Sequence, residues 1–361
     1  MKKVISKVLE FIVRKKGYSS YLGLKLINAI LSDFFKNKQN TLKEKIWAYR
    51  RGFLSPAIKE YGLNLDNYKL FLSDFDYTKM YPINGKFKMW IDDKLTTKYI
   101  LYPFREYLPK YYCHIKSTSS IIPLIDGDSI KNIADIVDLL KKEKNLALKL
   151  TAGTCGDGFY KLSYINNDFF INNNNVNQNE LIEFLSKLEN YLITEYIIVH
   201  SDLRKVYSYS ANTLRVMVIK EDRKQPIIAN AMMRFGTKES GVVDFSCCGG
   251  ISSIVDIKDG RYYNAKTIES NNVVSCKIHP DTKVSIEGIL PHFELIKEKV
   301  IEISKYLSEV RYMGFDVAIT DNGFKIIEVN SHQDIDWFQW YYPLLIDNPA
   351  EVFFKKLLSK K

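Results

Sequence analysis

The spacing of apolar residues divides the chain into a helical N-terminal part and a longer part rich in strands. Residues 2–16 carry apolar positions at helical spacing with lysines between them, and Gly17 ends that pattern. Leu22–Phe35 and Leu42–Arg51 predict two further helices. Beyond residue 62, short strands and helices alternate. We therefore expect residues 1–62 to form a basic helical region of their own.

The rest of the chain mixes both kinds of element. The pattern predicts helices at Thr97–Leu108, Ser129–Lys142, Leu181–Tyr191, Pro291–Val310 and Ala350–Leu358, and strands at Asn145–Leu150, Phe159–Tyr164, Leu192–Val199, Thr213–Lys220, Pro226–Phe235, Val242–Phe245 and Ile251–Asp256. Asn166–Asn179 is rich in asparagine, so we interpret it as a hairpin tip or an insertion without a core of its own. We expect three parts beyond the helical region, at residues 63–144, 145–198 and 199–361.

Near the C-terminus, residues 313–330 predict a β-hairpin. Phe315–Thr320 and Phe324–Asn330 are apolar-rich strands, and Asp321-Asn322-Gly323 between them is a turn sequence. A two-residue Asn322-Gly323 turn would set Val317 opposite Glu328. The three-residue loop instead sets Asp316 opposite Glu328.

The length of this loop decides which side chains share a face. Only the three-residue loop places Asp316, Glu328 and Asn330 together, because side chains alternate along a strand with period two. Three converging oxygen-bearing side chains suit a hard cation such as Mg²⁺. The alternative is a surface hairpin with solvated carboxylates.

Positive charge is confined to the N-terminal region. Residues 1–62 hold 14 Lys and Arg against 4 Asp and Glu, a net charge of +10, and the whole chain also carries +10. Residues 63–361 are therefore neutral overall, which argues against nucleic-acid binding. The N-terminal helices either pack on the body with solvated lysines or rest on an anionic membrane through residues 1–16, and the two alternatives are compatible.

The cysteines and the apolar segments indicate a cellular compartment. Five cysteines without paired spacing fit a reducing cytoplasm rather than a disulfide framework or a metal site. We recognise no signal peptide and no apolar span of 18 residues. The sequence therefore predicts a cytoplasmic protein that is able to lie peripherally at the inner face of the membrane.

A glycine-rich segment follows the buried strand that ends near Lys149. Gly153, Gly156 and Gly158 lie between this strand and the returning one. Glycines let backbone N–H groups approach a phosphate closely, and a neighbouring lysine neutralises its charge. The order of residues is that of neither a P-loop nor a Rossmann fingerprint, and an ordinary turn is the alternative.

Two further motifs carry charge on strands. The strand that begins at Leu192 carries Glu195, Tyr196 and Ile197 and then runs into a break. An acidic residue at such an edge, with free backbone groups just beyond it, is suited to reading adenine; the alternative is an exposed glutamate on an edge strand. Arg215 and Arg234 lie in otherwise apolar strands. If these strands pair, two guanidinium groups face one phosphate chain, whereas the alternative is two surface arginines.

The order of these motifs resembles that of the ATP-grasp superfamily over residues 90–335. Asp93-Lys94 resembles the Asp-Lys segment of D-alanine–D-alanine ligases, and Lys149 resembles the second nucleotide lysine of the superfamily. Its metal triad is matched by Asp316, Glu328 and Asn330.

A closer likeness is to ATP-grasp proteins associated with sugar transfer and surface-polysaccharide loci, the teichuronopeptide type included. It rests on residues 47–53 (WAYRRGF), 195–197 with His200, 212–215 (NTLR), 234–236 (RFG), 243–244 and 249–250. Three residues depart from the family pattern. Leu150 stands where proline usually follows the lysine, Phe245 stands where asparagine is expected, and Cys155 lies in the glycine-rich loop.

The resemblance implies an α+β, ATP-grasp fold in which two α/β subdomains clamp ATP with one or two Mg²⁺, behind the N-terminal helical region. Its nucleotide contacts would be Lys94, Lys149, Gly153, Gly156, Gly158, Glu195, Tyr196, Ile197 and Asp202. Arg215 and Arg234 would stabilise the transferring phosphoryl group, and Asp316, Glu328 and Asn330 would hold the metal. His200, His332, Gln333 and Asp336 would contact the substrate.

The implied reaction is ATP-dependent ligation of a carboxylate to an amine. The carboxylate attacks the γ-phosphate to give an acyl phosphate, and the amine then displaces phosphate. The expected partners are a carboxylate-bearing sugar or amino acid and an amine acceptor, in capsular or other surface-glycan assembly. Two alternatives remain: an ATP-dependent phosphotransferase acting on a glycan hydroxyl, and a non-catalytic nucleotide-binding accessory of glycan assembly.

Overall fold

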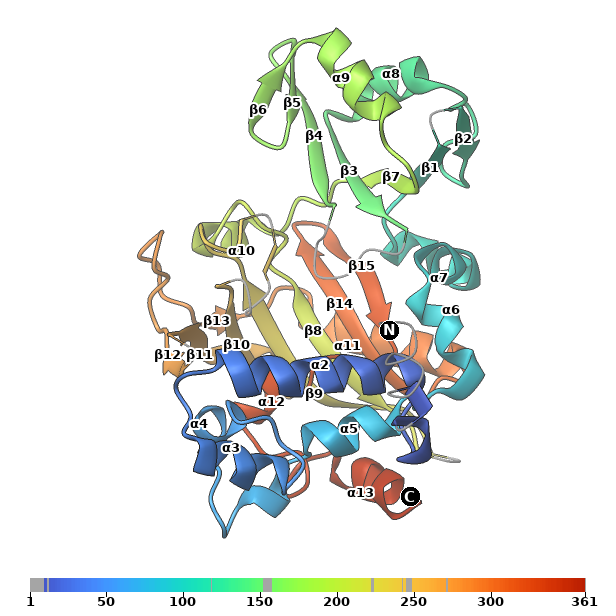
Figure 1. Ribbon diagram of the computed structural model, residues 1–361. Helices are drawn as coiled ribbons and strands as arrows, with labels where there is room; N and C mark the ends of the chain where they lie inside the picture. The colour runs from blue at the N-terminus through green and yellow to red at the C-terminus, as the bar shows by residue number, and fades with distance from the viewer. Residues whose placement is uncertain are drawn as a thin grey trace. The chain divides into compact units, whose positions relative to one another are not determined.

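The computed structural model describes residues 10–11, 13–117, 119–151, 158–221, 224–241, 243–244, 249–270 and 272–360 (Figure 1). The chain divides into two compact units. The first comprises Met1–Asp92, Asp202–Val317 and Val329–Lys361, and the second comprises Asp93–Ser201 and Ala318–Glu328.

The N-terminal part of the first unit is helical, as predicted. It contains α2 (Ser20–Lys36), α3 (Leu42–Tyr49), α4 (Ala57–Glu60), η1 (Tyr68–Leu70), α5 (Asp74–Met80), η2 (Gly85–Lys88) and α6 (Met89–Asp92). The start of α3 is fixed by a capping box, because Thr41 and Glu44 each accept a hydrogen bond from the other's backbone N–H. Most of the predicted helix at residues 2–16 lies outside the described residues. Among the described helices, none is both long and apolar enough to cross a membrane.

An eight-stranded antiparallel sheet carries the rest of the first unit, although Ala318–Glu328 of its last two strands are counted with the second unit. Its order is β12-β11-β10-β9-β8-β14-β15, and β13 pairs with β11. The strands are β8 (Leu214–Ile219), β9 (Ile227–Phe235), β10 (Ile251–Val255), β11 (Arg261–Glu269), β12 (Asn272–Ser275), β13 (Gly288–Ile289), β14 (Tyr312–Thr320) and β15 (Gly323–Asn330). The accompanying helices are α10 (Ser201–Val206), α11 (Phe293–Tyr306), α12 (Asp336–Gln339) and α13 (Glu351–Ser359).

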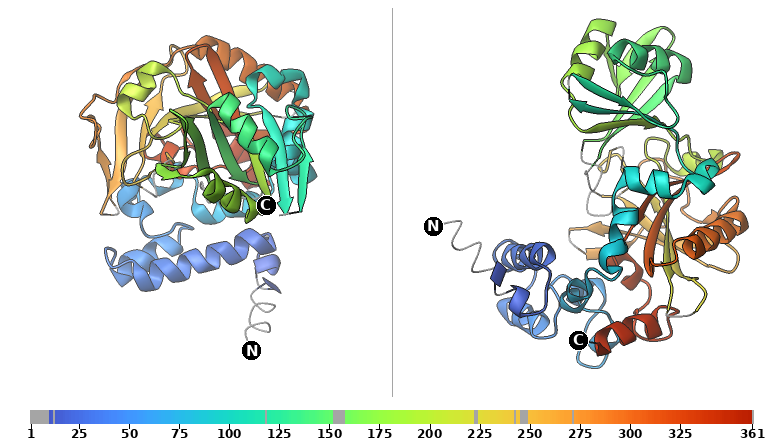
Figure 2. Two further views of the ribbon diagram at one scale, coloured as in Figure 1. Left: turned by 90° about the horizontal axis from the view of Figure 1, so that it is seen from above. Right: turned by 90° about the vertical axis from the view of Figure 1, so that its right-hand side faces the viewer.

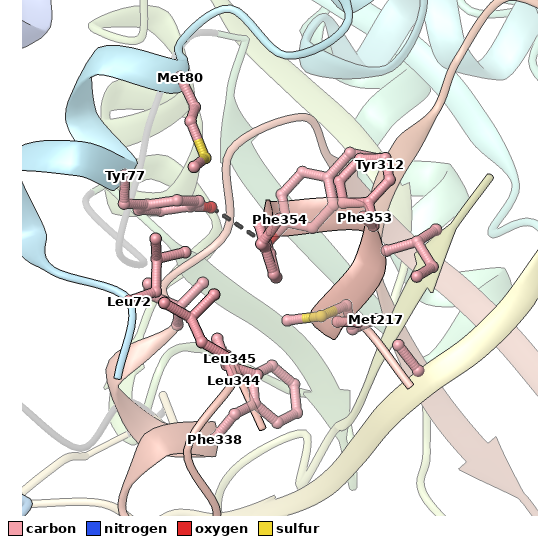
Figure 3. Packing of buried hydrophobic residues seen from close by; sticks show 14 of the residues in the cluster. Leu72, Tyr77, Met80, Met217, Tyr312, Phe338, Leu344, Leu345, Phe353 and Phe354 are labelled. Carbon is pink, nitrogen blue, oxygen red and sulfur yellow. Dashed lines mark hydrogen bonds between the residues drawn. The ribbon is translucent and has the colours of Figure 1, made fainter. Parts of the chain in front are cut away.

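The core of the first unit lies between this sheet and the helices on one of its faces. Figure 2 shows α2 and α5 on one side of the sheet and α11 on the other. Tyr77 and Met80 of α5, with Phe353 and Phe354 of α13, pack against Tyr312 of β14 (Figure 3). Inside this apolar cluster the Tyr77 and Tyr312 hydroxyls are 3.1 Å apart and hydrogen-bonded, so neither phenol is buried without a partner.

The second unit is built on a seven-stranded antiparallel sheet of order β2-β1-β7-β3-β4-β5-β6. Its elements are α7 (Lys94–Ile100), η3 (Tyr102–Tyr107), β1 (Tyr111–Ser117), β2 (Ser120–Pro123), α8 (Ile133–Glu143), β3 (Asn145–Leu150), β4 (Tyr160–Ile165), β5 (Asp168–Ile171), β6 (Asn174–Val176), α9 (Gln178–Ser186) and β7 (Tyr191–Glu195). Ile136 and Leu140 of α8, with Leu181 and Leu185 of α9, are fully buried on the face of the sheet that carries Leu148.

The asparagine-rich segment is more ordered than predicted. It forms β5 and β6, which extend the sheet, and Phe169 is buried in the core of the second unit. Asn166, Asn167 and Asn172 all have positive φ. Asparagine tolerates this conformation in tight turns, so the asparagines serve the two hairpin turns rather than an insertion without a core.

The hairpin at residues 313–330 is present, but its turn is shorter than predicted. Only Asp321 and Asn322 lie between β14 and β15, and Gly323 (φ +139°) is already the first residue of β15. Glycine lacks a Cβ and can take the unusual backbone angle of the turn while entering the strand. The strand bounds thus differ from the predicted loop by Gly323 alone, and the placement of Asp316, Glu328 and Asn330 on one face stays a prediction.

Candidate functional site

Three strands of the first unit bring two arginines and an aspartate together. In the ladder between β14 and β8, Asp316 lies opposite Arg215. Arg234 comes from β9, which pairs with β8, so the two arginine strands do pair, as the phosphate-binding alternative required. Thr213 and Asp244 complete this group, which we call the arginine–aspartate cluster.

The arginine–aspartate cluster is held by charge-assisted hydrogen bonds. Arg215 forms a bidentate ion pair with Asp316, in which Nε lies 2.5 Å from Oδ1 and Nη2 lies 3.0 Å from Oδ2. Arg234 Nη2 lies 2.8 Å from the same Oδ1, and Arg234 Nε donates to Thr213 Oγ1 at 3.0 Å. Asp244 accepts from the Thr213 backbone at 2.7 Å and hydroxyl at 2.6 Å.

Burial makes these ion pairs strong and interdependent. Arg215, Arg234 and Asp316 are all buried, so each charge depends on its partners rather than on water. Burial alone would raise the pKa of Asp316, but the two guanidinium groups hold it below its ordinary value. With both of its oxygens occupied by arginines, Asp316 is an ionised anchor for those arginines in this structure.

In the second unit, two lysines and a glutamate form a different group. Lys94 is the first residue of α7, and the Asp93 side chain caps that helix by accepting from Thr96 N at 2.8 Å. The helix therefore starts three residues before the predicted Thr97. Lys94 Nζ lies 3.4 Å from Oε1 of Glu328, near the end of β15. With Lys149 of β3 they form what we call the lysine–glutamate cluster.

Lys149 lies in an environment that disfavours its charge. Burial, and secondarily the charge of Lys94, lowers the pKa of Lys149 to about 8, although Glu328 acts in the opposite direction. Lys94 and Lys149 thus both lie close to the charge of Glu328. A lysine whose charge is disfavoured by burial is stabilised by a bound polyanion.

A third lysine on this face was missed in the sequence. Lys161 of β4 lies opposite Ala147 of β3, two residues from Lys149, so both lysines leave the same face of the sheet. Burial lowers the pKa of Lys161, and its Nζ lies 4.6 Å from the ring centroid of Tyr196. Only the strand register reveals this placement, because a lone lysine in an apolar run looks like any solvent-facing position.

Glu195 lies on the other face. It pairs with Leu146, whereas Lys149 pairs with Leu192, and positions three residues apart on one strand face opposite ways. Its Oε2 accepts from Lys110 N at 3.0 Å, and its own N–H donates to Lys110 O at 2.9 Å. Here the glutamate fastens β7 to the segment before β1.

The remaining predicted nucleotide contacts lie in different surroundings. Gly153 and Gly156 lie outside the described residues, whereas Gly158 has φ +67°, and a Cβ there would come within 2.7 Å of Leu150. Ile197 is partly buried. Asp202 is exposed and 2.6 Å from Lys205.

His200 belongs to the segment that follows β7. Its backbone N–H donates to Ile319 O at 2.7 Å, and its Nε2 lies 3.8 Å from Asp321. Asp321 also accepts from Ser201 N at 2.8 Å. The hairpin turn thus fixes the start of this segment.

The three predicted substrate residues beyond β15 lie in the first unit. His332 stacks on Tyr77 at 4.2 Å between ring centroids, and Gln333 is buried, with its carbonyl accepting from the Tyr77 hydroxyl at 2.6 Å. Asp336 accepts from the Tyr61 hydroxyl at 2.8 Å.

Asp336 belongs to a group of acids that the sequence did not reveal. Burial and the charge of Asp334 raise its pKa to about 6, and burial together with Asp336 raises the pKa of Glu60 to about 7 and that of Asp74 to about 8. These residues come from three separate segments, so no local motif could have identified the group. Within the described residues, no three His, Cys, Asp or Glu side chains are arranged to hold a metal ion.

Comparison with known proteins gives one family. The model of the family described as sugar-transfer associated ATP-grasp matches residues 74–344, more than half of the chain. No curated protein matches the chain.

Solved structures with a similar arrangement are distant in sequence. One is D-alanyl-alanine synthetase A from Vibrio cholerae O1 biovar eltor str. N16961, with 10% identity, 75% of this chain and 65% of that chain covered, and a TM-score of 0.42. Another is the ATP-grasp ligase PsnB complexed with minimal precursor, Mg and ADP, with 12% identity, 76% and 60% covered, and a TM-score of 0.35. A third is N5-carboxyaminoimidazole synthase from Aspergillus clavatus in complex with ADP and 5-aminoimidazole ribonucleotide, with 12% identity, 74% and 54% covered, and a TM-score of 0.39. The chain spans less than two thirds of the length of each.

Proposed function

The chain belongs to the sugar-transfer associated ATP-grasp family, and from this premise we propose that it is an ATP- and Mg²⁺-dependent ligase that joins a carboxylate to an amine. The observation that supports the proposal most is the placement of Lys94 and Lys149 around Glu328, where burial lowers the pKa of Lys149 to about 8. A triphosphate chain would stabilise the charged form of Lys149.

The proposed nucleotide contacts follow from the placement of these lysines. Lys94 and Lys149 bind the phosphates, with Lys161 beside Tyr196 as an addition to the predicted set. The backbone of the glycine-rich loop at Gly153, Gly156 and Gly158 covers the phosphates. The backbone groups of Tyr196 and Ile197 hold adenine, and Glu195 joins them only by releasing Lys110, to which its carboxylate is bound. Asp202 or His200 reaches the ribose or the substrate.

The metal would be held by Asp316, Glu328 and Asn330. Their carboxylate and amide oxygens are the donors that Mg²⁺ prefers, and Glu328 is a third exposed. Asp316 fits only while sharing its oxygens with Arg215 and Arg234, because both guanidinium groups already bind it. When bound, Mg²⁺ neutralises charge on the phosphate oxygens.

The two arginines then act on the transferring group. Arg215 and Arg234 are fixed by Asp316 and Asp244, so their direction is set before any substrate binds. A substrate carboxylate oxygen attacks the γ-phosphorus and ADP leaves, which gives an acyl phosphate. The amine nitrogen then attacks the acyl carbon, loses a proton and expels phosphate, so one ATP yields one amide, ADP and phosphate.

The substrate class is a carboxylate-bearing sugar or an amino acid in capsular or other surface-glycan assembly. The family description, which names sugar transfer, supports this choice. His332, Gln333 and Asp336 are the proposed substrate contacts. Contact of residues 1–16 with an anionic membrane stays a prediction, since residues 1–9 and 12 lie outside the described part of the chain.

The test is product analysis with ATP, Mg²⁺, nucleotide-linked uronic acids and a panel of amino acids. We expect free phosphate and an amide in equal amounts. A phosphorylated sugar without free phosphate would instead establish the phosphotransferase. Nucleotide binding without turnover by any pair, together with unchanged surface glycan in cells carrying Glu328→Gln, would establish the non-catalytic accessory.

A further inference from the structure

Several large apolar side chains of helix α2 are left exposed by its packing in the first unit. Ten of its 17 residues are apolar, but its buried residues are Gly23 and Asp33. By contrast, α11 buries Phe293, Ile296, Val300 and Ile303 along one face. An ordinary surface helix of a globular protein turns its apolar stripe inwards, so α2 departs from that arrangement.

The outward face of α2 presents large side chains. Tyr21 is 71% exposed, Phe35 is 73% exposed and Leu31 is 48% exposed. With Leu24 these residues recur at intervals of three, seven and four, which places them along one side of the helix. Phe34, packed edge-on against Phe35 at 5.1 Å, and Leu42 and Ile46 of α3 continue the exposed apolar surface.

A polar anchor holds α2 in this orientation. The Asp33 carboxylate accepts from the Tyr49 hydroxyl at 2.8 Å, from the Ser55 backbone at 2.8 Å and from Asn37 at 2.9 Å. These bonds lower the pKa of Asp33 against the opposing effect of burial, so it stays ionised and bound. At the other end of α2, Gly23 permits a close approach, because a Cβ there would lie 2.7 Å from Val13. The helix is thus fixed near both ends, and Tyr21, Leu31, Phe34 and Phe35 stay exposed, whereas its other apolar side chains are partly buried.

Lysines surround this apolar side. Lys25 and Lys36 lie on α2 beside the stripe, and Lys38 and Lys43 follow it; all four are exposed and form no ion pair with any described residue. The N-terminal 62 residues carry a net +10, whereas the rest of the chain is neutral. Large apolar side chains bordered by unpaired lysines are the pattern of a helix that lies in the interface of an anionic bilayer.

We propose that α2, with the start of α3, is a membrane-docking surface that lies flat on a bilayer containing anionic lipid. The charge decides between the candidate occupants, because a second copy of the chain would bring the same lysines face to face. The surface differs from the contact expected at residues 1–16, and it is independent of the proposed ligase, since α2 contributes no residue to either cluster.

The test uses the full chain and vesicles of phosphatidylcholine, with and without phosphatidylglycerol. We expect flotation with the anionic vesicles only, and loss of binding in high salt. Leu31→Ser with Phe35→Ser should lower the bound fraction roughly tenfold, because the apolar contact is removed while the charge is kept. Lys25→Glu with Lys36→Glu should lower the preference for anionic vesicles.

Matched controls distinguish docking through α2 from non-specific binding through any exposed apolar side chain. Ile289→Ser removes a side chain that is equally exposed, at 71%, on β13 of the same unit, and binding should stay unchanged. Thermal unfolding and ATP binding should match the parent protein in every variant, since the replaced side chains are exposed.

Three results would overturn the proposal. The first is unchanged flotation of the Leu31→Ser and Phe35→Ser variant. The second is complete loss of flotation on deletion of residues 1–9 while that double variant still binds. The third is a dimer in solution that the double variant disrupts, with no vesicle binding by the parent protein.

Discussion

The arginine–aspartate cluster and the lysine–glutamate cluster differ in how their buried charges are compensated. In the first, two arginines meet Asp316 and Asp244, and the charges balance before any ligand arrives. In the second, Lys94 and Lys149 share Glu328, and the pKa of Lys149 falls to about 8. In the first cluster each charge lies against an opposite charge, whereas in the second the charge of Lys149 is disfavoured by burial.

This difference predicts different effects of substitutions in the two clusters. A balanced group of buried ion pairs is rigid, because removing any member leaves an uncompensated charge. A buried lysine whose charge is disfavoured gains most from an anionic ligand. We therefore expect substitutions in the first cluster to act on folding as well as on phosphoryl transfer, and substitutions in the second to act mainly on nucleotide binding and turnover.

The largest effect is expected from Asp316→Asn. It leaves two buried guanidinium groups without their shared carboxylate, and the free energy of unfolding should fall by about 3–5 kcal/mol. Denaturant titration measures this loss. A fall of less than about 1 kcal/mol would mean that Asp316 does not anchor the two arginines.

Glu328→Gln is the matched substitution in the other cluster. The Lys94–Glu328 pair is 3.4 Å long with the glutamate a third exposed, so its loss should cost less than about 1 kcal/mol of stability. Mg²⁺-dependent ATP turnover should nevertheless fall by roughly 100-fold or more if Glu328 is a metal ligand. Retained turnover in the folded variant would refute the metal assignment.

Some features of the fold and the site could be predicted from the sequence, whereas others depend on contacts between distant segments. The strand β3 with Lys149 at its end, the pairing of the two arginine strands and the existence of the hairpin all follow from local pattern and motif order. The placement of Lys161, the burial of Gln333 and the meeting of Glu60 with Asp74 depend on strand register and on distant segments. The start of β15 at Gly323 was not predicted, because this glycine serves both turn and strand.

The pH dependence of ATP binding tests the proposed role of Lys149. If Lys149 binds phosphate in its charged form, that binding should weaken as the pH rises from 7 to 9, because its pKa is about 8. The Kd for ATP should therefore weaken roughly tenfold over this range. Lys149→Arg, whose guanidinium stays charged, should flatten the profile in calorimetric titrations.

The smallest effect concerns Asp74, a buried acid that no described cation neutralises. Burial and Asp336 raise its folded-state pKa to about 8, above the unfolded value, so folding favours the protonated form. Stability should accordingly fall as the pH rises from 6 to 8, by on the order of 1 kcal/mol. Asp74→Asn should remove that slope, whereas the exposed Asp66→Asn should not; an unchanged slope in Asp74→Asn would show that another group titrates.

Transfer of an oxygen atom tests the central claim, carboxylate activation by ATP, most directly. Once product analysis has identified a carboxylate and amine pair, the carboxylate is labelled with ¹⁸O and the released phosphate is examined by mass spectrometry. An acyl phosphate formed at the γ-phosphorus and cleaved by the amine leaves one substrate oxygen in the phosphate, so each turnover should yield phosphate carrying a single ¹⁸O. Unlabelled phosphate accompanying amide formation would contradict the account.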